Sequence, residues 1–149
     1  IPAIETSPAF ELLLSGKLDK IEMLNERDVN VVDYKTAAPK SRNVLEGKTK
    51  NTDGNYHRQL VFYKLLLDLE EKNGQKKTYR MLSGELDFIE PDAKGNYHKE
   101  RFDISDEQVA ELMTLVKEKA REIRDLSFWN MACNDAKCAY CALSRELKI

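Results

Sequence analysis

Hydrophobic and polar positions along the chain predict two strands, a helix, a β-hairpin and a second helix, in that order. Apolar residues alternate imperfectly over residues 10–23, which predicts one long strand with a bulge at Gly16. A β-branched pair then begins a second strand over 31–36, after a turn at 25–30. An antiparallel pairing of these two strands would be the start of a sheet.

In the second half of the chain, the spacing of apolar residues predicts a helix, then two strands and then a second helix. Leucines recurring over 56–72 give one broad apolar face, which predicts a helix packed on the sheet. Residues 78–90 and 97–104 alternate around a turn-rich segment and predict a hairpin. The capping-box pattern Ser105–Gln108 begins a helix over 105–126 with one apolar stripe. We therefore expect an α/β (α+β) fold, with a central mixed, largely antiparallel sheet of about four strands flanked by helices.

Residues 37–55 are predicted to form a long loop, and loops of this length are often functional or disordered. The net charge of the chain is only −2, so any contact with a nucleic acid requires a local basic patch. Two readings stay open: the loop holds a phosphate backbone, or it is a solvated loop. Its basic residues are Lys40, Arg42, Lys48 and Lys50.

Candidate chemistry lies on the second predicted strand. Side chains two residues apart on a strand share a face, so Asp33 and Lys35 project together. An antiparallel partner strand would bring Asp19 beside them. Two carboxylates can bind a hard divalent cation, and a lysine can orient a water molecule or stabilise negative charge. The alternative is a chance pairing of an acid and a lysine on a half-exposed strand.

Three short patterns occur in order: Gly16-Lys17-Leu18-Asp19, Asp33-Tyr34-Lys35-Thr36 and Gln59-Leu60-Val61-Phe62-Tyr63. In this order they resemble the RecB-like branch of the PD-(D/E)xK nuclease superfamily, and specifically the nuclease-type domain at the C-terminus of UvrD/Rep-type DNA helicases. The resemblance covers nearly the whole chain and implies a restriction-endonuclease-like core. We expect residues 1–149 to be a single RecB-like nuclease domain. Because the chain begins at Ile1 rather than Met, we also expect it to be a C-terminal fragment of a longer helicase.

The resemblance also implies an activity and a set of residues that carry it. Asp19 and Asp33 would bind Mg²⁺ or Mn²⁺, and Lys35 would help a metal-bound water to attack the phosphodiester. Gln59 and Tyr63 would position DNA or the catalytic strand, although Tyr63 also fits the role of a core aromatic. The protein would then be a Mg²⁺-dependent deoxyribonuclease, with DNA and the motor domains of the same chain as partners.

One departure from the family bears on this activity. The family adds a His or Glu from a helix before the first strand, and these 149 residues begin after that helix would end. We therefore expect the chain alone to bind metal weakly and to cut poorly. The alternative function is a catalytically inactive nuclease-fold module that binds or guides DNA within a helicase.

Residues 127–149 form a tail that contains all three cysteines, Cys133, Cys138 and Cys141. The Cys-x2-Cys half has metal-binding spacing, but three thiolates are one ligand short for zinc or an iron–sulfur cluster. Several RecB-like nucleases carry a four-cysteine iron–sulfur site, and the last cysteine of that pattern corresponds to Leu147 here. The three residues therefore bind Zn or an iron–sulfur cluster with a ligand from elsewhere, or they are reduced thiols that pack a turn.

The cysteines and the hydropathy also bear on the location of the protein. An odd number of closely spaced cysteines is not typical of a secreted disulfide framework, so we expect a cytoplasmic location. No apolar run approaches the roughly 20 residues of a membrane span.

Overall fold

The computed structural model describes residues 3–5, 10–70, 79–127, 133, 135 and 137–147. The chain divides into two compact units, Ile1–Lys117 and Glu118–Ile149. The first unit contains the sheets, the helices α1 and α2 and most of α3. The second contains the end of α3 and the cysteines.

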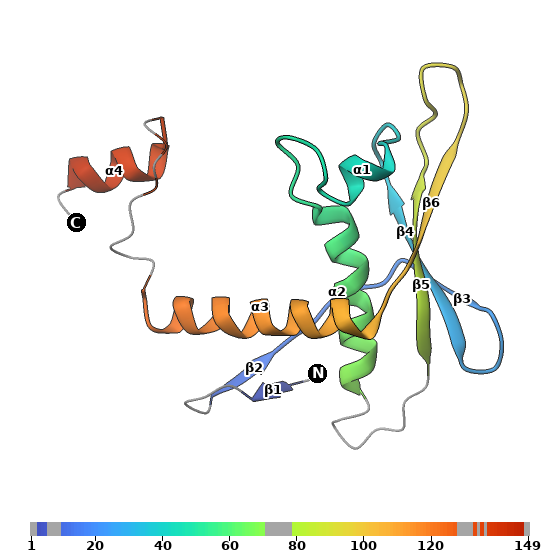
Figure 1. Ribbon diagram of the computed structural model, residues 1–149, viewed down its shortest axis with the longest axis horizontal. Helices are drawn as coiled ribbons and strands as arrows, with labels where there is room; N and C mark the ends of the chain where they lie inside the picture. The colour runs from blue at the N-terminus through green and yellow to red at the C-terminus, as the bar shows by residue number, and fades with distance from the viewer. Residues whose placement is uncertain are drawn as a thin grey trace. The chain divides into compact units, whose positions relative to one another are not determined.

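A four-stranded sheet in the order β3-β4-β5-β6 is the centre of the first unit (Figure 1). Its strands are β3 (Lys20–Met23), β4 (Asp28–Lys35), β5 (Arg80–Phe88) and β6 (His98–Asp103). The β3–β4 and β5–β6 pairs are antiparallel, whereas the central β4–β5 pair is parallel. This confirms the predicted α+β fold with a mixed sheet and the predicted hairpin, and it is consistent with a restriction-endonuclease-like core.

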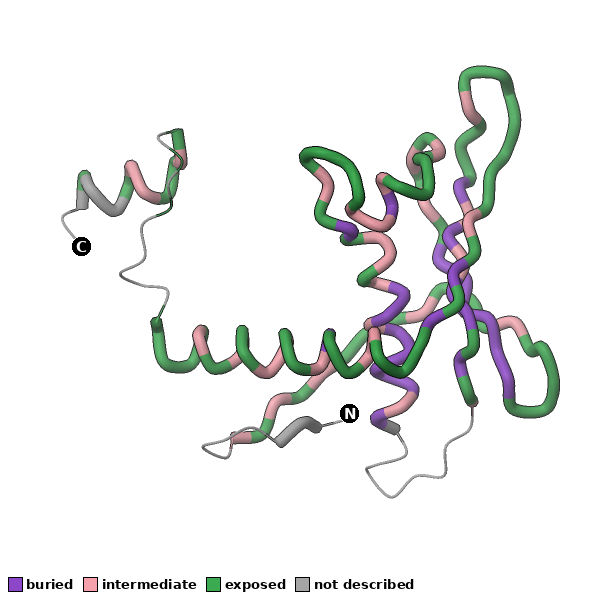
Figure 2. The backbone as a smooth tube through the Cα atoms, in the orientation of Figure 1, coloured by how far each residue is buried: buried purple, intermediate pink, exposed green. Residues whose placement is uncertain are grey.

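The parallel pair requires a crossover, which α1 (Arg42–Leu45) and α2 (Asn55–Glu70) supply. Helix α2 packs closely on the sheet because Gly84 of β5 has no side chain: a Cβ there would lie 2.9 Å from the Cβ of Leu60. Buried residues accordingly concentrate in β4, β5 and α2 (Figure 2).

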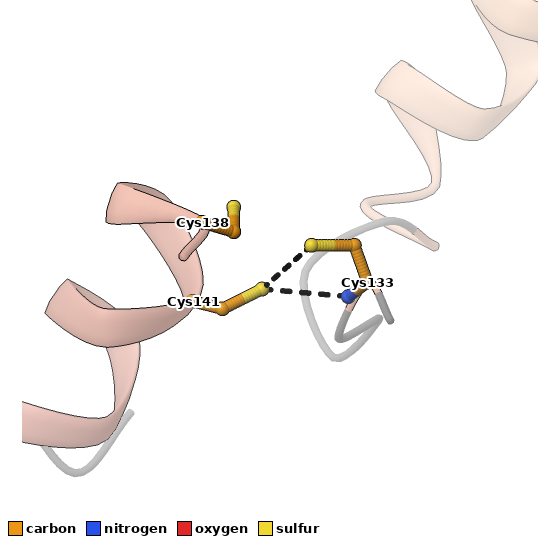
Figure 3. Close-up of side chains that lie close together, drawn as sticks. All are labelled: Cys133, Cys138 and Cys141. Atoms are coloured by element: carbon orange, nitrogen blue, oxygen red, sulfur yellow. Dashed lines mark hydrogen bonds between the residues drawn. The ribbon is translucent and has the colours of Figure 1, made fainter. Parts of the chain in front are cut away.

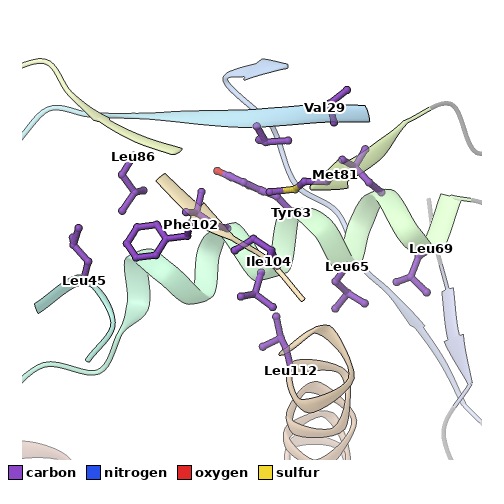
Figure 4. Close-up of a cluster of buried hydrophobic side chains, with 14 of the residues drawn as sticks. Val29, Leu45, Tyr63, Leu65, Leu69, Met81, Leu86, Phe102, Ile104 and Leu112 are labelled. Atoms are coloured by element: carbon purple, nitrogen blue, oxygen red, sulfur yellow. The ribbon is translucent and has the colours of Figure 1, made fainter. Parts of the chain in front are cut away.

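Helix α3 (Asp106–Arg124) adds Leu112 to the same core cluster, beside Ile104 and Leu65 (Figure 4). Its start confirms the predicted capping box. The backbone N–H of Gln108 donates to the Ser105 hydroxyl, and the backbone N–H of Ser105 donates to the Gln108 side chain. Among the described residues, no helix combines the length and apolar character needed to cross a membrane.

The opposite face of the sheet carries a polar network. Ser83 donates to Asn30, Asn30 donates to Glu22, and the Arg101 guanidinium donates to Ser83. Asn30 and Ser83 are each only 1% exposed, so these bonds compensate for the burial of their polar groups.

The prediction of one long strand over 10–23 is wrong. Residues Glu11–Leu13 form β2, which pairs with β1 (Ala3–Glu5) in a separate two-stranded sheet, and β3 begins only at Lys20. Between them the chain passes over α2, where a Cβ on Gly16 would lie 2.7 Å from the Cδ1 of Leu66. This contact with α2, rather than a strand bulge, accounts for Gly16.

Two further boundaries differ from the prediction. The turn ends at Arg27, because the Asn25 side chain accepts the N–H groups of Arg27 and Asp28 and the chain then enters β4. The predicted loop over 37–55 contains α1, whose Leu45 is buried in the core and anchors the segment. Helix α2 is described to Glu70, so the expected end at residue 72 lies outside the described residues.

In the second unit, α4 (Ala139–Leu147) follows the cysteine-containing segment. This helix was not predicted from the sequence. Residues 128–132, 134 and 136 lie outside the described residues.

Candidate active site

On the face of β4 that α2 covers, the side chains are apolar in the first half of the strand and charged in the second half. Val29 and Val31 belong to the buried core, and the two-residue period places Asp33 and Lys35 on the same face. Asp33 is only 3% exposed. A buried carboxylate needs charged and hydrogen-bonding partners, and α2 supplies most of them.

Asp33 is held by two side chains from α2 and one from its own strand. Its Oδ1 accepts hydrogen bonds from the Tyr63 hydroxyl at 2.6 Å and from the Gln59 Nε2 at 3.0 Å. Its Oδ2 lies 2.6 Å from the Nζ of Lys35, which donates to the Gln59 Oε1 at 2.6 Å. Four side chains predicted from the sequence thus form one closed network.

The phenol of Tyr63 keeps its proton in this network. Burial, followed by the hydrogen bond to Asp33 and its negative charge, raises the pKa of Tyr63 well above its usual range. The phenol is therefore a permanent donor to Asp33, and Tyr63 is both a core residue and a site residue.

Asp19 lies just before β3, opposite Asp33 in the antiparallel pair, in which Lys20 is the partner of Val32. Its Oδ2 accepts the backbone N–H of Tyr34 at 3.0 Å, between the two charged residues of β4. The structure therefore brings Asp19 to the edge of the site, where it is exposed to solvent.

These residues fit a divalent metal ion. The buried Oδ2 of Asp33 accepts no hydrogen bond from the part of the chain that the structure describes, since the contact with Lys35 is an ion pair without hydrogen-bond geometry. The Asp33 Oδ2, whose close polar contact is the Lys35 ammonium at 2.6 Å, and the Asp19 carboxylate, which faces Asp33 in the strand register, are hard oxygen ligands of the kind that Mg²⁺ and Mn²⁺ prefer.

The four basic residues of the predicted loop separate into two pairs. Arg42 contacts Glu46 and Glu100 and stacks on the ring of Phe102, and Lys48 pairs with Glu46. The Nζ of Lys40, by contrast, lies 4.6 Å from the centroid of the Tyr56 ring, and no described carboxylate is in ion-pair contact with Lys40 or Lys50.

Tyr56 also contacts the site, which its sequence position alone did not predict. Its ring also lies 4.6 Å from the Nζ of Lys35, so it contacts the core of the site. The sequence feature that indicates this contact is the spacing of Tyr56, which lies three residues before Gln59 and therefore on the same side of α2.

A second cluster lies in the other unit, at the start of α4. The Sγ atoms of Cys133, Cys138 and Cys141 all lie within 4.8 Å of one another, and none forms a disulfide (Figure 3). The sulfurs of Cys133 and Cys141 lie 3.3 Å apart. The geometry brings all three predicted ligands together, and thiolates at this spacing suit a soft metal.

The three thiols are not equivalent. A hydrogen bond from the Cys141 backbone, followed by those from the Cys133 and Cys141 side chains, lowers the pKa of Cys138 to about 7. At Cys133 a backbone hydrogen bond with Asp135 lowers the pKa, but the bonds to Cys141 and Cys138, with burial, raise it overall. Cys138 is therefore the thiol that ionises first of these two.

A family model for the PD-(D/E)XK nuclease superfamily matches residues 2–145. The chain belongs to the PD-(D/E)XK nuclease superfamily. Neither the comparison with curated proteins nor that with solved structures found a match. Membership agrees with the mixed sheet that carries Asp33 and Lys35, and this superfamily typically uses divalent metals.

Proposed function

We propose that this chain is a metal-dependent DNA nuclease domain that hydrolyses phosphodiester bonds as part of a DNA helicase or repair protein. The observation that carries the proposal is the buried Asp33 carboxylate, with one oxygen free of hydrogen bonds beside the Lys35 ammonium. A buried charge pair is costly to retain for stability alone, and such groups cluster at functional sites.

In this proposal Asp19 and Asp33 would hold Mg²⁺ or Mn²⁺, which supplies charge stabilisation and an activated water. Tyr63 and Gln59 hold Asp33 in one orientation, because each donates a hydrogen bond to its Oδ1. Lys35 lies where its ammonium can stabilise negative charge on a phosphate bound beside Asp33. The resemblance of the three ordered motifs supports DNA as substrate and helicase motor domains in the same chain, and the odd number of closely spaced cysteines supports a cytoplasmic location.

The test is cleavage of labelled single- and double-stranded DNA with Mg²⁺ or Mn²⁺, in the longest native chain that contains these residues. Asp33→Ala and Lys35→Ala should each abolish cleavage. Asp87→Ala is a matched control, since Asp87 lies on the neighbouring strand in an ion pair with Lys99. Cleavage that survives both site substitutions would overturn the proposal.

A catalytically inactive module that binds or guides DNA is the second candidate. The closed network favours it, because Lys35 neutralises Asp33 and Gln59 contacts both, as in a structural ion pair. DNA binding by the native protein without cleavage under any divalent metal would select this candidate.

The cysteine cluster supports a separate proposal, that Cys133, Cys138 and Cys141 bind zinc or an iron–sulfur cluster with a fourth ligand from another residue. Three sulfurs within 4.8 Å of one another support it. The competing interpretation is three reduced thiols that pack the turn before α4. Stoichiometric zinc or iron in protein purified without added metal would favour a metal site, and metal-free protein with unchanged folding would favour the thiols.

A further inference from the structure

The ring of Tyr56 is in contact with two ammonium groups, one from inside the site and one from the loop after β4. Lys35 and Lys40 each place Nζ 4.6 Å from the ring centroid. Aromatic faces attract cations at this range, so the ring offers both lysines a favourable contact. One side chain thus joins the predicted catalytic lysine to a loop lysine.

The position of Tyr56 on α2 explains how it reaches both. Tyr56, Gln59 and Tyr63 occupy positions i, i+3 and i+7, which form one stripe along a helix. Gln59 and Tyr63 are both bonded to Asp33, so this stripe faces the charged end of β4. Tyr56 extends the stripe by one turn, toward the loop that carries Lys40.

The two lysines differ in what neutralises them. Lys35 is paired with Asp33, whereas Lys40 is exposed and has no carboxylate partner among the described residues. Arg42, two residues further along, is already paired with Glu46 and Glu100. Lys40 therefore brings an unpaired positive charge next to the site, at a position that the Tyr56 ring fixes.

We propose that Tyr56 and Lys40 form a phosphate subsite beside the catalytic centre, in which Tyr56 is a positioning residue and Lys40 binds one phosphodiester of the DNA backbone. The ligand is the phosphate next to the one that Asp33 and Lys35 would hold. This inference rests on the proposed function, because it assumes that DNA lies across this face of α2 and β4. It adds a residue and a contact that the nuclease motifs do not include.

The test measures binding of a fluorescent single-stranded oligonucleotide to the full chain in EDTA, where metal-dependent cleavage cannot occur. The dissociation constant is determined over a range of salt concentrations for the unmodified protein and for Lys40→Met, Tyr56→Leu, Tyr56→Phe and the double variant Lys40→Met/Tyr56→Leu. Lys94→Met, in the exposed turn between β5 and β6, removes the same charge elsewhere. Thermal unfolding of each variant checks that it is folded.

Lys40→Met should weaken binding about fivefold at 0.1 M salt and reduce the salt slope by about 0.7, the contribution of one phosphate contact on a single strand. Tyr56→Leu should have a similar effect, Tyr56→Phe should bind like the unmodified protein, and the double variant should be no worse than either single one. Lys94→Met should leave the slope unchanged.

Three results would overturn the subsite: no DNA binding by the unmodified protein, an unchanged salt slope in Lys40→Met, or a normal slope in Tyr56→Leu. A Tyr56→Leu protein that fails to unfold cooperatively would leave the decision to Lys40→Met and Tyr56→Phe, which alter the charge and the hydroxyl separately. Failure of the proposed nuclease activity is distinguishable, because it would appear as absent cleavage with Mg²⁺ while these binding differences persist.

Discussion

Two clusters in this protein have the composition of a metal site, and the chain builds them in opposite ways. The carboxylate–lysine site combines residues from three places in the chain: Asp19 just before β3, Asp33 on β4 and Tyr63 on α2. The cysteine cluster uses only residues 133–141 at the start of α4. The first is centred on the buried Asp33 and exists only once the sheet and α2 have packed, whereas the second is set by a local turn.

The difference in ligands follows the difference in construction. Carboxylate oxygens select hard cations such as Mg²⁺ and gain their strength from a fixed, desolvated geometry. Thiolates select softer cations such as Zn²⁺ and Cu⁺. We therefore expect the two clusters to be independent, so that each responds to its own substitutions.

The largest expected effect is that of Asp33→Asn. The amide keeps the size of the side chain but removes the negative charge, so we expect cleavage to fall by about 10³-fold or more, the scale for losing one preorganised electrostatic group. Co²⁺ binding by the cysteines, followed by thiolate-to-metal absorption, should not change. A variant that cuts normally would contradict the catalytic role of Asp33, and one that also loses Co²⁺ binding would contradict the separation of the two clusters.

Cys138→Ser is the reciprocal substitution and should have the next largest effect. Removal of the thiol with the lowered pKa should weaken Co²⁺ binding by roughly 100-fold, because a hydroxyl is a poor ligand at neutral pH. Rates of DNA cleavage should match those of the unmodified protein. Unchanged Co²⁺ affinity would show that the cluster is not a metal site.

Gly16→Ala tests the claim that the first cluster depends on packing. The added methyl would lie 2.7 Å from the Leu66 Cδ1, the end of a side chain that can shift, so we expect the free energy of unfolding to fall by about 1 kcal/mol or less. Cleavage should also fall, because Gly16 precedes Asp19 on the segment that passes over α2. Urea denaturation measures the stability, and Lys17→Ala at the exposed next position serves as the control. Equal stability of the two variants would show that Leu66 moves aside without cost.

The sequence predicted the parts of the site that depend on local periodicity. A two-residue period placed Asp33 and Lys35 on one face, and a four-residue spacing placed Gln59 and Tyr63 on another, and the structure brings all four together. The capping box at Ser105 is equally local and was also found. Their roles in catalysis stay a prediction.

What the sequence did not reveal depends on contacts between distant segments. The alternation of apolar and polar residues over 10–23 is the same whether the segment forms one strand or two. The structure distinguishes the two cases, because residues 11–13 pair with β1 and Gly16 then contacts α2. The pairing of Arg42 with Glu100 joins residues far apart in the chain, so the predicted basic loop is less available to a phosphate than its composition indicates. Tyr56 resembled an ordinary aromatic residue at a helix start until its contacts with two lysines were visible.

The smallest expected effect concerns the pH at which the cysteines react. The thiolate is the reactive form, so a pKa of about 7 leaves about half of Cys138 ionised at neutral pH, while the raised pKa of Cys133 keeps it mostly a thiol. We expect brief iodoacetamide treatment of metal-free protein at pH 7 to modify Cys138 several-fold faster than Cys133, as measured by mass spectrometry.

The difference should narrow as the pH rises, because Cys133 then ionises as well, and it should persist in Asp33→Asn. That persistence is expected because backbone and side-chain hydrogen bonds within residues 133–141 cause the shift, and none comes from the sheet. Equal modification rates at pH 7 would show that these hydrogen bonds do not favour the Cys138 thiolate. A rate difference that disappears in Asp33→Asn would show instead that the cysteine cluster depends on the packed core, as the carboxylate–lysine site does.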